Sequence, residues 1–113
     1  MFRLFSRKKS AFENLGATQF EEALKINRKA VVIDVRSPRE FKQGHLPKAK
    51  NINVMDSNFA DKIARLDKDA DYYVYCRSGA RSKAAAKLMT RNGFESVTNL
   101  VGGISGWSGK IVR

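Results

Sequence analysis

The chain contains one cysteine, and the residues after it are suited to holding a reactive sulfur. Cys76 is followed by Arg77-Ser78-Gly79-Ala80-Arg81-Ser82. Gly79 permits backbone angles that other residues avoid, so a tight loop here would direct successive backbone N–H groups towards the sulfur. A helix start and two arginines add positive charge, and such surroundings favour the reactive thiolate over the thiol. The same N–H groups would bind an oxyanion or the outer sulfur of a persulfide.

The elements on both sides of this loop determine where Cys76 lies. Residues 71–75 (DYYVY) have the aromatic and β-branched character of a strand that ends directly before the cysteine. Residues 82–92 predict a helix, with Gly93 as its C-cap. Residues 96–100 predict a last strand, which the glycines of Val101-Gly102-Gly103 then interrupt. Although a lone cysteine is more often a buried structural thiol, its place between a strand and a helix favours a nucleophile here.

The first half of the chain also predicts strands alternating with helices. Residues 18–25 predict a helix with Thr18 as its cap, and residues 30–35 predict a strand buried on both faces. Ser37-Pro38-Arg39-Glu40 carries the serine, proline and glutamate signals of a helix start, and Gly44 ends that short helix. We also expect a strand at residues 51–54 and a helix at residues 58–66.

Strands separated by helices imply an α/β fold, with a mainly parallel sheet and helices on both of its faces. In such sheets ligands bind beyond the carboxyl ends of the strands. We therefore expect residues 34–36, Cys76 and residues 101–103 to meet at one edge of the sheet.

Three separate motifs, in order along the chain, resemble single-domain rhodaneses. The loop Cys76-Arg77-Ser78-Gly79-Ala80-Arg81-Ser82 resembles the active-site loop of that family. Residues 32–41, Gly44-His45-Leu46-Pro47-Lys48-Ala49 and Asn51-Ile52 resemble its first signature, and Gly93-Phe94, Val97, residues 100–104 and Trp107 resemble its closing one. The resemblance covers about residues 12–110.

This resemblance implies a rhodanese-like domain with a five-stranded, mainly parallel sheet flanked by helices. It also implies a sulfurtransferase, a thiosulfate sulfurtransferase by type, in which Cys76 is the nucleophile and carries the transferred sulfur as a persulfide. The backbone N–H groups of the loop would stabilise the thiolate and the persulfide, and the side chains of Arg77 and Arg81 would bind the anionic donor. The substrate-binding residues expected on this basis are Arg77, Ser78, Gly79, Ala80, Arg81 and Ser82.

The sulfur donor and acceptor stay open at this point. Thiosulfate, a cysteine-desulfurase persulfide and small persulfides all suit a cationic cup as donors. Cyanide, glutathione, thioredoxin or a sulfur-carrier protein would serve as acceptors. No cofactor and no metal is expected. Outside the loop, we expect Asp34 and Arg36 to form an ion pair that shapes it, His45 to make a structural hydrogen bond, and Trp107 to anchor packing below the terminal loop.

The charge balance points to anionic partners without choosing among them. Twenty-two Lys and Arg against 11 Asp and Glu give a net charge of +11. Four of these cations fall within residues 1–10, which we interpret as a flexible basic tail ahead of a domain at residues 11–113. A peripheral membrane contact through this tail is the weaker alternative. Because no apolar run suits a membrane span or a secretory signal, a cytoplasmic protein is expected, and the unpaired cysteine agrees with it.

Two other functions are alternatives to a sulfurtransferase. A cysteine phosphatase loop needs arginine six positions after the cysteine, whereas serine stands at position 82 and Arg81 comes one position too early. The alternative that we keep is a non-catalytic rhodanese-like binding module with a basic surface. Specific nucleic-acid binding is not expected, since the sequence lacks a basic motif interleaved with aromatic residues.

Overall fold

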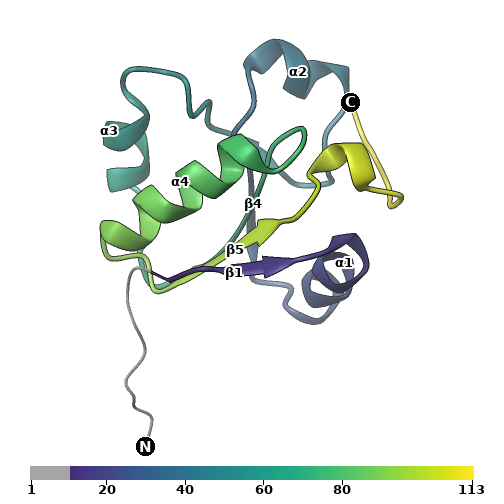
Figure 1. The fold of residues 1–113 in the computed structure, drawn as a ribbon, viewed down its shortest axis with the longest axis horizontal. Coiled ribbons are helices and arrows are strands. Elements are labelled where there is room, and N and C mark those ends of the chain that lie inside the picture. Colours follow the sequence, from purple (N-terminus) through teal and green to yellow (C-terminus); the bar gives the residue numbers. More distant parts are fainter. Residues whose placement is uncertain (1–10) are drawn as a thin grey trace, which may run out of the picture.

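The computed structural model describes residues 11–113, which form a parallel five-stranded sheet with helices on both faces (Figure 1). The expected α/β class and five-stranded sheet are therefore confirmed. The strands run in the order β1-β5-β4-β2-β3, so β4, which leads into Cys76, is central. Along the chain the elements are β1 (Glu13–Leu15), α1 (Ala17–Ile26), β2 (Val31–Asp34), α2 (Pro38–Gln43), β3 (Lys50–Asn51), α3 (Phe59–Ala64), β4 (Asp71–Tyr75), α4 (Ala80–Arg91), β5 (Ser96–Leu100) and the 3₁₀ helix η1 (Ile104–Gly106).

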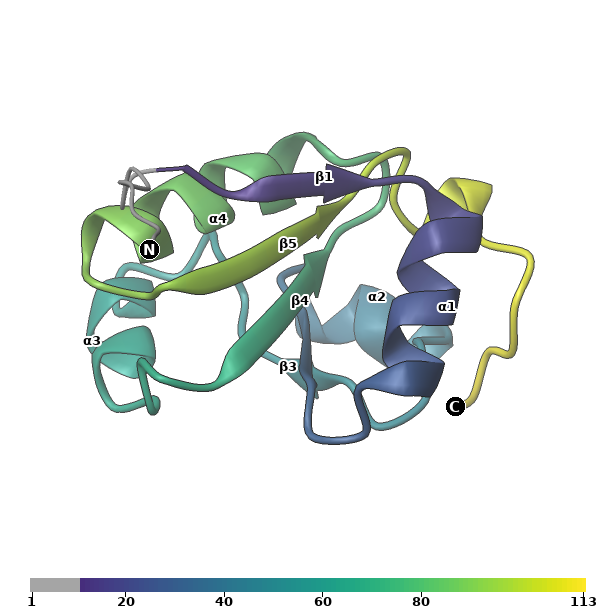
Figure 2. The same cartoon turned by 90° about the horizontal axis from the view of Figure 1, so that it is seen from below.

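The two faces of the sheet bury separate apolar clusters, because successive strand side chains point to opposite sides. On one face α3 and α4 cover a cluster that includes Ile33, Val74 and Cys76. On the other face Phe20 of α1 packs with Val32 and Tyr75. Figure 2 shows β1, β5 and β4 side by side, with α3 at the left end of the view and α1 at the right end. Cys76 thus lies beneath α4.

Several local predictions hold in detail. The strands β4 and β5 have the predicted bounds. At the start of α2, Ser37 and Glu40 form the expected capping box, and Gly44 is the C-cap. Gly93, expected as the C-cap of α4, instead follows the C-cap residue Asn92, and it has the left-handed backbone (φ of 93°) typical of a residue that ends a helix.

Other boundaries differ from the prediction. Thr18 does not cap α1, because the N–H of Phe20 already bonds to the carbonyl of Gly16, which is the N-cap residue. The helix α4 begins at Ala80 rather than Ser82, since the carbonyl of Gly79 accepts from Lys83. The regular part of the strand expected at residues 51–54 is only Lys50–Asn51, and the helix expected at residues 58–66 spans Phe59–Ala64.

The basic tail expected at residues 1–10 lies outside the described residues. Within residues 11–113, none of the helices combines the length and apolar character needed to cross a bilayer.

Candidate functional site

Cys76 lies at the carboxyl end of the central strand and is only 1% exposed. Its neighbours come from the ends of the adjacent strands, as the parallel topology predicts. The N–H of Val35, directly after β2, donates to the carbonyl of Tyr75 at 3.0 Å. The N–H of Ile104, in the turn after β5, donates to the carbonyl of Cys76 itself at 2.9 Å. The three segments expected at this edge of the sheet therefore do meet there.

The Cys76 sulfur receives hydrogen bonds from the loop and from the first turn of α4. The N–H of Gly79 lies 3.1 Å from Sγ, and the hydroxyl oxygen of Ser82 lies 3.4 Å from it. The Ser82 hydroxyl is also 3.2 Å from the carbonyl oxygen of Gly79. It has a single hydrogen, so it can donate to either acceptor, and a negatively charged sulfur makes the stronger demand.

The balance of burial and hydrogen bonding lowers the pKa of the Cys76 thiol. Burial opposes ionisation, but it is outweighed by hydrogen bonds from the Ser82 side chain and from the backbone N–H groups of Ser82, Gly79 and Ser78. Each of these donors stabilises the charged form. The site therefore favours a thiolate inside an otherwise apolar part of the sheet.

The glycines after β5 let the chain pack against the cysteine loop from behind. A Cβ atom on Gly103 would lie 2.4 Å from the carbonyl oxygen of Arg77 and 2.6 Å from that of Cys76. The next two residues, Ile104 and Ser105, donate their N–H groups to these same two carbonyls. Both loop carbonyls are thereby held on the side of η1, which leaves the N–H groups of the loop free to face the sulfur.

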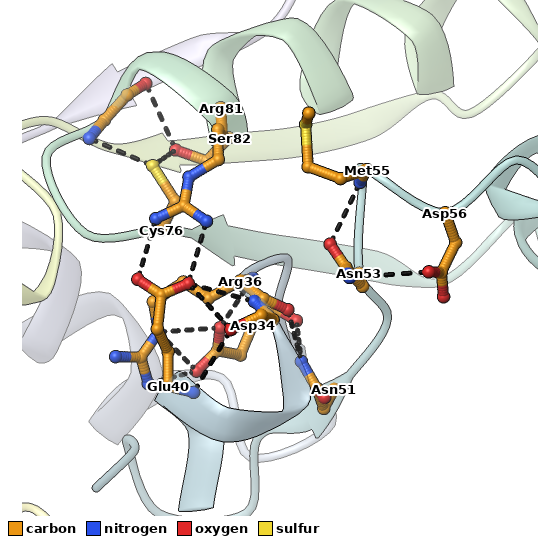
Figure 3. Close-up of polar contacts among 12 residues, drawn as sticks. Asp34, Arg36, Glu40, Asn51, Asn53, Met55, Asp56, Cys76, Arg81 and Ser82 are labelled. Carbon is orange, nitrogen blue, oxygen red and sulfur yellow. Dashed lines mark hydrogen bonds and ion pairs between the residues drawn. The ribbon is translucent and has the colours of Figure 1, made fainter. Parts of the chain in front are cut away.

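Arg81 forms a bidentate ion pair with Glu40 of α2. Both contacts, Nη1 to Oε1 and Nη2 to Oε2, measure 2.9 Å. Figure 3 shows this pair next to Cys76, with the carboxylate and the guanidinium facing each other. The hydrogen bond from Arg81 is the main reason why the pKa of Glu40 falls to about 2. The guanidinium group of Arg81 thus places a formal positive charge near the sulfur, and the Glu40 carboxylate holds it in position.

The expected ion pair between Asp34 and Arg36 is present and buried. The guanidinium Nη2 lies 2.6 Å from the Asp34 carboxylate and 2.7 Å from the carbonyl oxygen of Gly44. The Tyr75 hydroxyl donates to the same carboxylate at 2.7 Å and accepts from the N–H of Leu46 at 3.1 Å. This network joins the ends of β2 and β4, and Tyr75 immediately precedes Cys76. Its role towards the sulfur is therefore to position the strand end.

The remaining expected residues lie either at the loop surface or in packing contacts elsewhere in the domain. Arg77, Ser78 and Ala80 are exposed at the loop surface. His45 stacks on Phe41 with ring centroids 3.8 Å apart, and its Nδ1 lies 3.0 Å from the carbonyl oxygen of Phe41, in agreement with a structural role. Trp107 packs edge-on against Phe20 at 6.0 Å between centroids, as an anchor should.

Sequence reasoning missed three side chains of the site. Glu40 was recognised only as a helix-capping residue, Ser82 only for its backbone N–H, and Tyr75 only as part of a strand. The adjacency of β2 and β4 would have given a signal for Glu40, because it places the first turns of α2 and α4 next to each other. For the Tyr75 hydroxyl there was no such local signal, because it donates to Asp34, its register partner on β2, and accepts from the N–H of Leu46 in a distant loop.

The sequence of the chain is similar to a known domain family and to several named proteins. Residues 17–110 match the model of the rhodanese-like domain family. The chain is 33% identical over 98 residues to the putative sulfurtransferase YtwF of Bacillus subtilis, with 87% of this chain and 92% of YtwF covered. It is 36% identical over 89 residues to the thiosulfate sulfurtransferase GlpE of Pseudomonas putida, with 77% and 79% covered. The uncharacterized protein YqhL of B. subtilis is 42% identical over 84 residues, which are 74% of this chain but only 65% of YqhL.

A solved structure agrees with these sequence relationships. The crystal structure of a rhodanese-related protein from Thermoplasma volcanium superimposes with a TM-score of 0.77 at 30% identity, covering 89% of this chain and 98% of that one. All three findings, from the family model, the relatives and the solved structure, indicate the same domain family. The chain belongs to the rhodanese-like domain family.

Proposed function

We propose that the protein is a rhodanese-type sulfurtransferase in which Cys76 carries the transferred sulfur as a persulfide. The observation that carries this proposal is the hydrogen bonding of a buried sulfur by the Gly79 N–H at 3.1 Å and by Ser82 at 3.4 Å. The names of YtwF and GlpE support the same activity class.

In the first half-reaction, the Cys76 thiolate attacks the outer sulfane sulfur of the donor. With thiosulfate, a new S–S bond forms at Sγ while the S–S bond of thiosulfate breaks, and its electron pair leaves with sulfite. No general base is needed once the thiol has ionised, and the lowered pKa of Cys76 favours that ionisation. The product is a persulfide whose outer sulfur carries the negative charge.

The loop is suited to holding this persulfide. The N–H groups of Ser78, Gly79 and Ser82 already stabilise negative charge on Cys76. A terminal sulfur bound to Sγ would meet the same group of donors, so the charge can move outward by one atom without losing its partners. The loop therefore needs little rearrangement when the persulfide forms. This favours a persulfide that stays stable on Cys76 until the acceptor binds.

The two arginines of the loop attract the donor in different ways. The Arg77 side chain is exposed and makes no ion pair within residues 11–113, so it is available to an incoming oxyanion. Arg81 is held by Glu40 through two of its nitrogens, which leaves its remaining N–H groups for the donor. We propose that both side chains bind the anionic donor, with Arg77 acting first at the surface.

In the second half-reaction a nucleophile attacks the outer sulfur of the persulfide. With cyanide, a carbon–sulfur bond forms, the S–S bond breaks, and its electron pair returns to Sγ as the thiolate. A thiol, either small or on a protein such as thioredoxin or a sulfur carrier, would take the sulfur in the same way and become a persulfide itself. The proposal covers thiosulfate and persulfides as donors, and cyanide and thiols as acceptors.

Steady-state formation of thiocyanate from thiosulfate and cyanide tests the proposed activity. The wild-type protein should form thiocyanate catalytically. The variant Cys76→Ser, folded as judged by circular dichroism, should be inactive. Glutathione persulfide in place of thiosulfate tests the second donor class. If neither donor gives turnover with the wild-type protein, the chain is a binding module rather than an enzyme. Equal turnover by wild type and Cys76→Ser would exclude the persulfide mechanism.

A further inference from the structure

A groove of about 370 Å³ lies on the α1 face of the molecule, and none of its lining residues belongs to the cysteine loop. Its walls come from three parts of the chain that are distant in sequence. These are the second half of α1 with the turn and the start of β2 that follow it, the loop that contains Leu46 and Lys48, and the C-terminal segment around Trp107 and Lys110. Figure 2 shows the C-terminal segment running past α1 at this end of the molecule.

The interior of the groove is apolar and held rigidly. Val32 and Leu46, 6% and 1% exposed, contribute to its floor, and Leu24 and Trp107 also line it. The Trp107 ring is fixed on two sides, because Nε1 donates to the carbonyl of Lys110 at 3.2 Å and the ring packs edge-on against Phe20. A rigid aromatic wall beside aliphatic side chains is typical of pockets that bind an apolar group.

The lining of the groove is strongly cationic. Lys25, Arg28, Lys48 and Lys110 line it, against one carboxylate, that of Glu21. All four cations are exposed, and none of them is in an ion pair within the described part of the chain. Four cations gathered around a single carboxylate repel one another, and an anion bound among them relieves that repulsion.

The backbone at Lys48 supports a built site. Lys48 has a φ of 66°, and it is the one non-glycine residue among residues 11–113 with a positive φ. The turn that contains it is closed by a hydrogen bond from Ala49 to Leu46 at 3.2 Å. Since a lysine in the left-handed region is disfavoured, the surrounding loop holds this cation at the groove against its own preference.

We propose that this groove binds a small organic anion with an apolar body, of the class of medium-chain carboxylates. The apolar part would lie against Leu24, Leu46 and Trp107, and the carboxylate would lie among the lysines. The volume is at the lower end of the range for small-molecule pockets, which favours one compact ligand over an extended peptide. The groove is separate from the proposed sulfur-transfer site, so binding of an anion in the groove can be tested independently of the proposed activity.

Octanoate is a direct probe, because Trp107 is the only tryptophan in the chain and its fluorescence reports on the groove. We expect a saturable change in Trp107 emission on titration with octanoate up to about 5 mM, and none with acetate, which lacks the apolar body. Octanol, which lacks the charge, should bind more weakly than octanoate. No saturable change with octanoate, or equal binding of octanol and octanoate, would overturn the proposal.

Two matched double variants locate the binding. Lys48→Gln/Lys110→Gln removes two cations of the groove and should weaken octanoate binding by about three- to twentyfold, as expected for two exposed charge pairs. Lys87→Gln/Arg91→Gln removes the same charge from α4, which covers the other face of the sheet, and should bind octanoate within about twofold of wild type. Thermal melts confirm that both variants are folded. Equal losses in the two variants would mean that only the net charge matters, and the groove would then not be the site.

Discussion

Arg81 and Glu40 tie the first turn of α4 to the first turn of α2 through two contacts of 2.9 Å. Glu40 also accepts from the N–H of Ser37 and so completes the capping box of α2. Arg81 precedes Ser82, whose hydroxyl and N–H stabilise the Cys76 thiolate. The ion pair therefore joins α2 to the turn that supplies hydrogen bonds to Cys76, and it neutralises the Glu40 carboxylate. In the proposed function, this carboxylate would otherwise repel an anionic donor.

Arg81→Ala should lower kcat/KM for thiosulfate by about ten- to a hundredfold, the range for loss of a charge-assisted contact. Part of this loss should come from the uncovered Glu40 carboxylate, so Arg81→Ala/Glu40→Gln should recover about three- to tenfold of it. Lys87→Ala is the matched control, because it removes a cation nearly two turns farther along α4. Steady-state kinetics of the three variants measure the effect.

Two outcomes would contradict this account of Arg81. Small and equal losses in Arg81→Ala and Lys87→Ala would mean that the backbone N–H groups bind the donor without help from the Arg81 side chain. A double variant no more active than Arg81→Ala would mean that the Glu40 charge does not act on the donor.

The pKa of the Cys76 thiol should lie below the ordinary value of about 8.5. Because the thiolate is the reactive species, the iodoacetamide rate should rise with pH and level off above that pKa. Ser82→Ala removes a hydrogen bond to the charged form, so the inflection should move to higher pH and the rate at neutral pH should fall about tenfold. Ser78→Ala keeps its backbone N–H and should leave the profile unchanged. An inflection at or above the free-cysteine value in the wild type would remove the proposed activation.

Gly103→Ala should destabilise the protein, because a Cβ there would lie 2.4 Å from the carbonyl oxygen of Arg77 and the residue has a φ of 60°. We expect the free energy of unfolding to fall by about 2–4 kcal/mol, within the range for large single-site effects. Gly106→Ala is the control, since nothing lies within 4 Å of a Cβ at that position. Urea unfolding of both variants tests this, and a Gly103→Ala variant as stable as Gly106→Ala would show that the turn is not closely packed on the loop.

The secondary-structure predictions were most accurate where the residues of one short segment determine the element by themselves. The strand before Cys76 and the capping box at Ser37 and Glu40 were predicted correctly, because β-branched content and capping spacing are local properties. The strand Glu13–Leu15 was not identified as an element. It is short, has no β-branched residue, and exists because β5 offers it a parallel edge.

The side-chain geometry of the site was less accessible to sequence reasoning. The donors to Cys76 were expected from the loop, but the pairing of Arg81 with Glu40 joins residues 41 positions apart. It depends on how α2 and α4 approach each other, which no local pattern encodes. The groove with Trp107 and Lys48 was hidden for the same reason, since its walls come from three distant segments.

Deletion of residues 1–10 should leave thiosulfate turnover within about twofold of the full chain, because none of the residues proposed to act on the sulfur falls among them. These residues precede the segment that matches the family, which spans residues 17–110. They carry four cations, Arg3, Arg7, Lys8 and Lys9, so any binding to vesicles of anionic lipid should fall on deletion and weaken with salt. A deletion variant that loses turnover or melts markedly earlier would show that the folded domain includes this segment.

The persulfide on Cys76 is the central claim, and intact-mass spectrometry after treatment with thiosulfate tests it most directly. Because Cys76 is the only cysteine, any added sulfur has one thiol to occupy. We expect the wild-type mass to rise by one sulfur atom, cyanide or a thiol to reverse the gain, and Cys76→Ser to show no gain. An unchanged wild-type mass with thiosulfate and with glutathione persulfide, or an equal gain in Cys76→Ser, would contradict it.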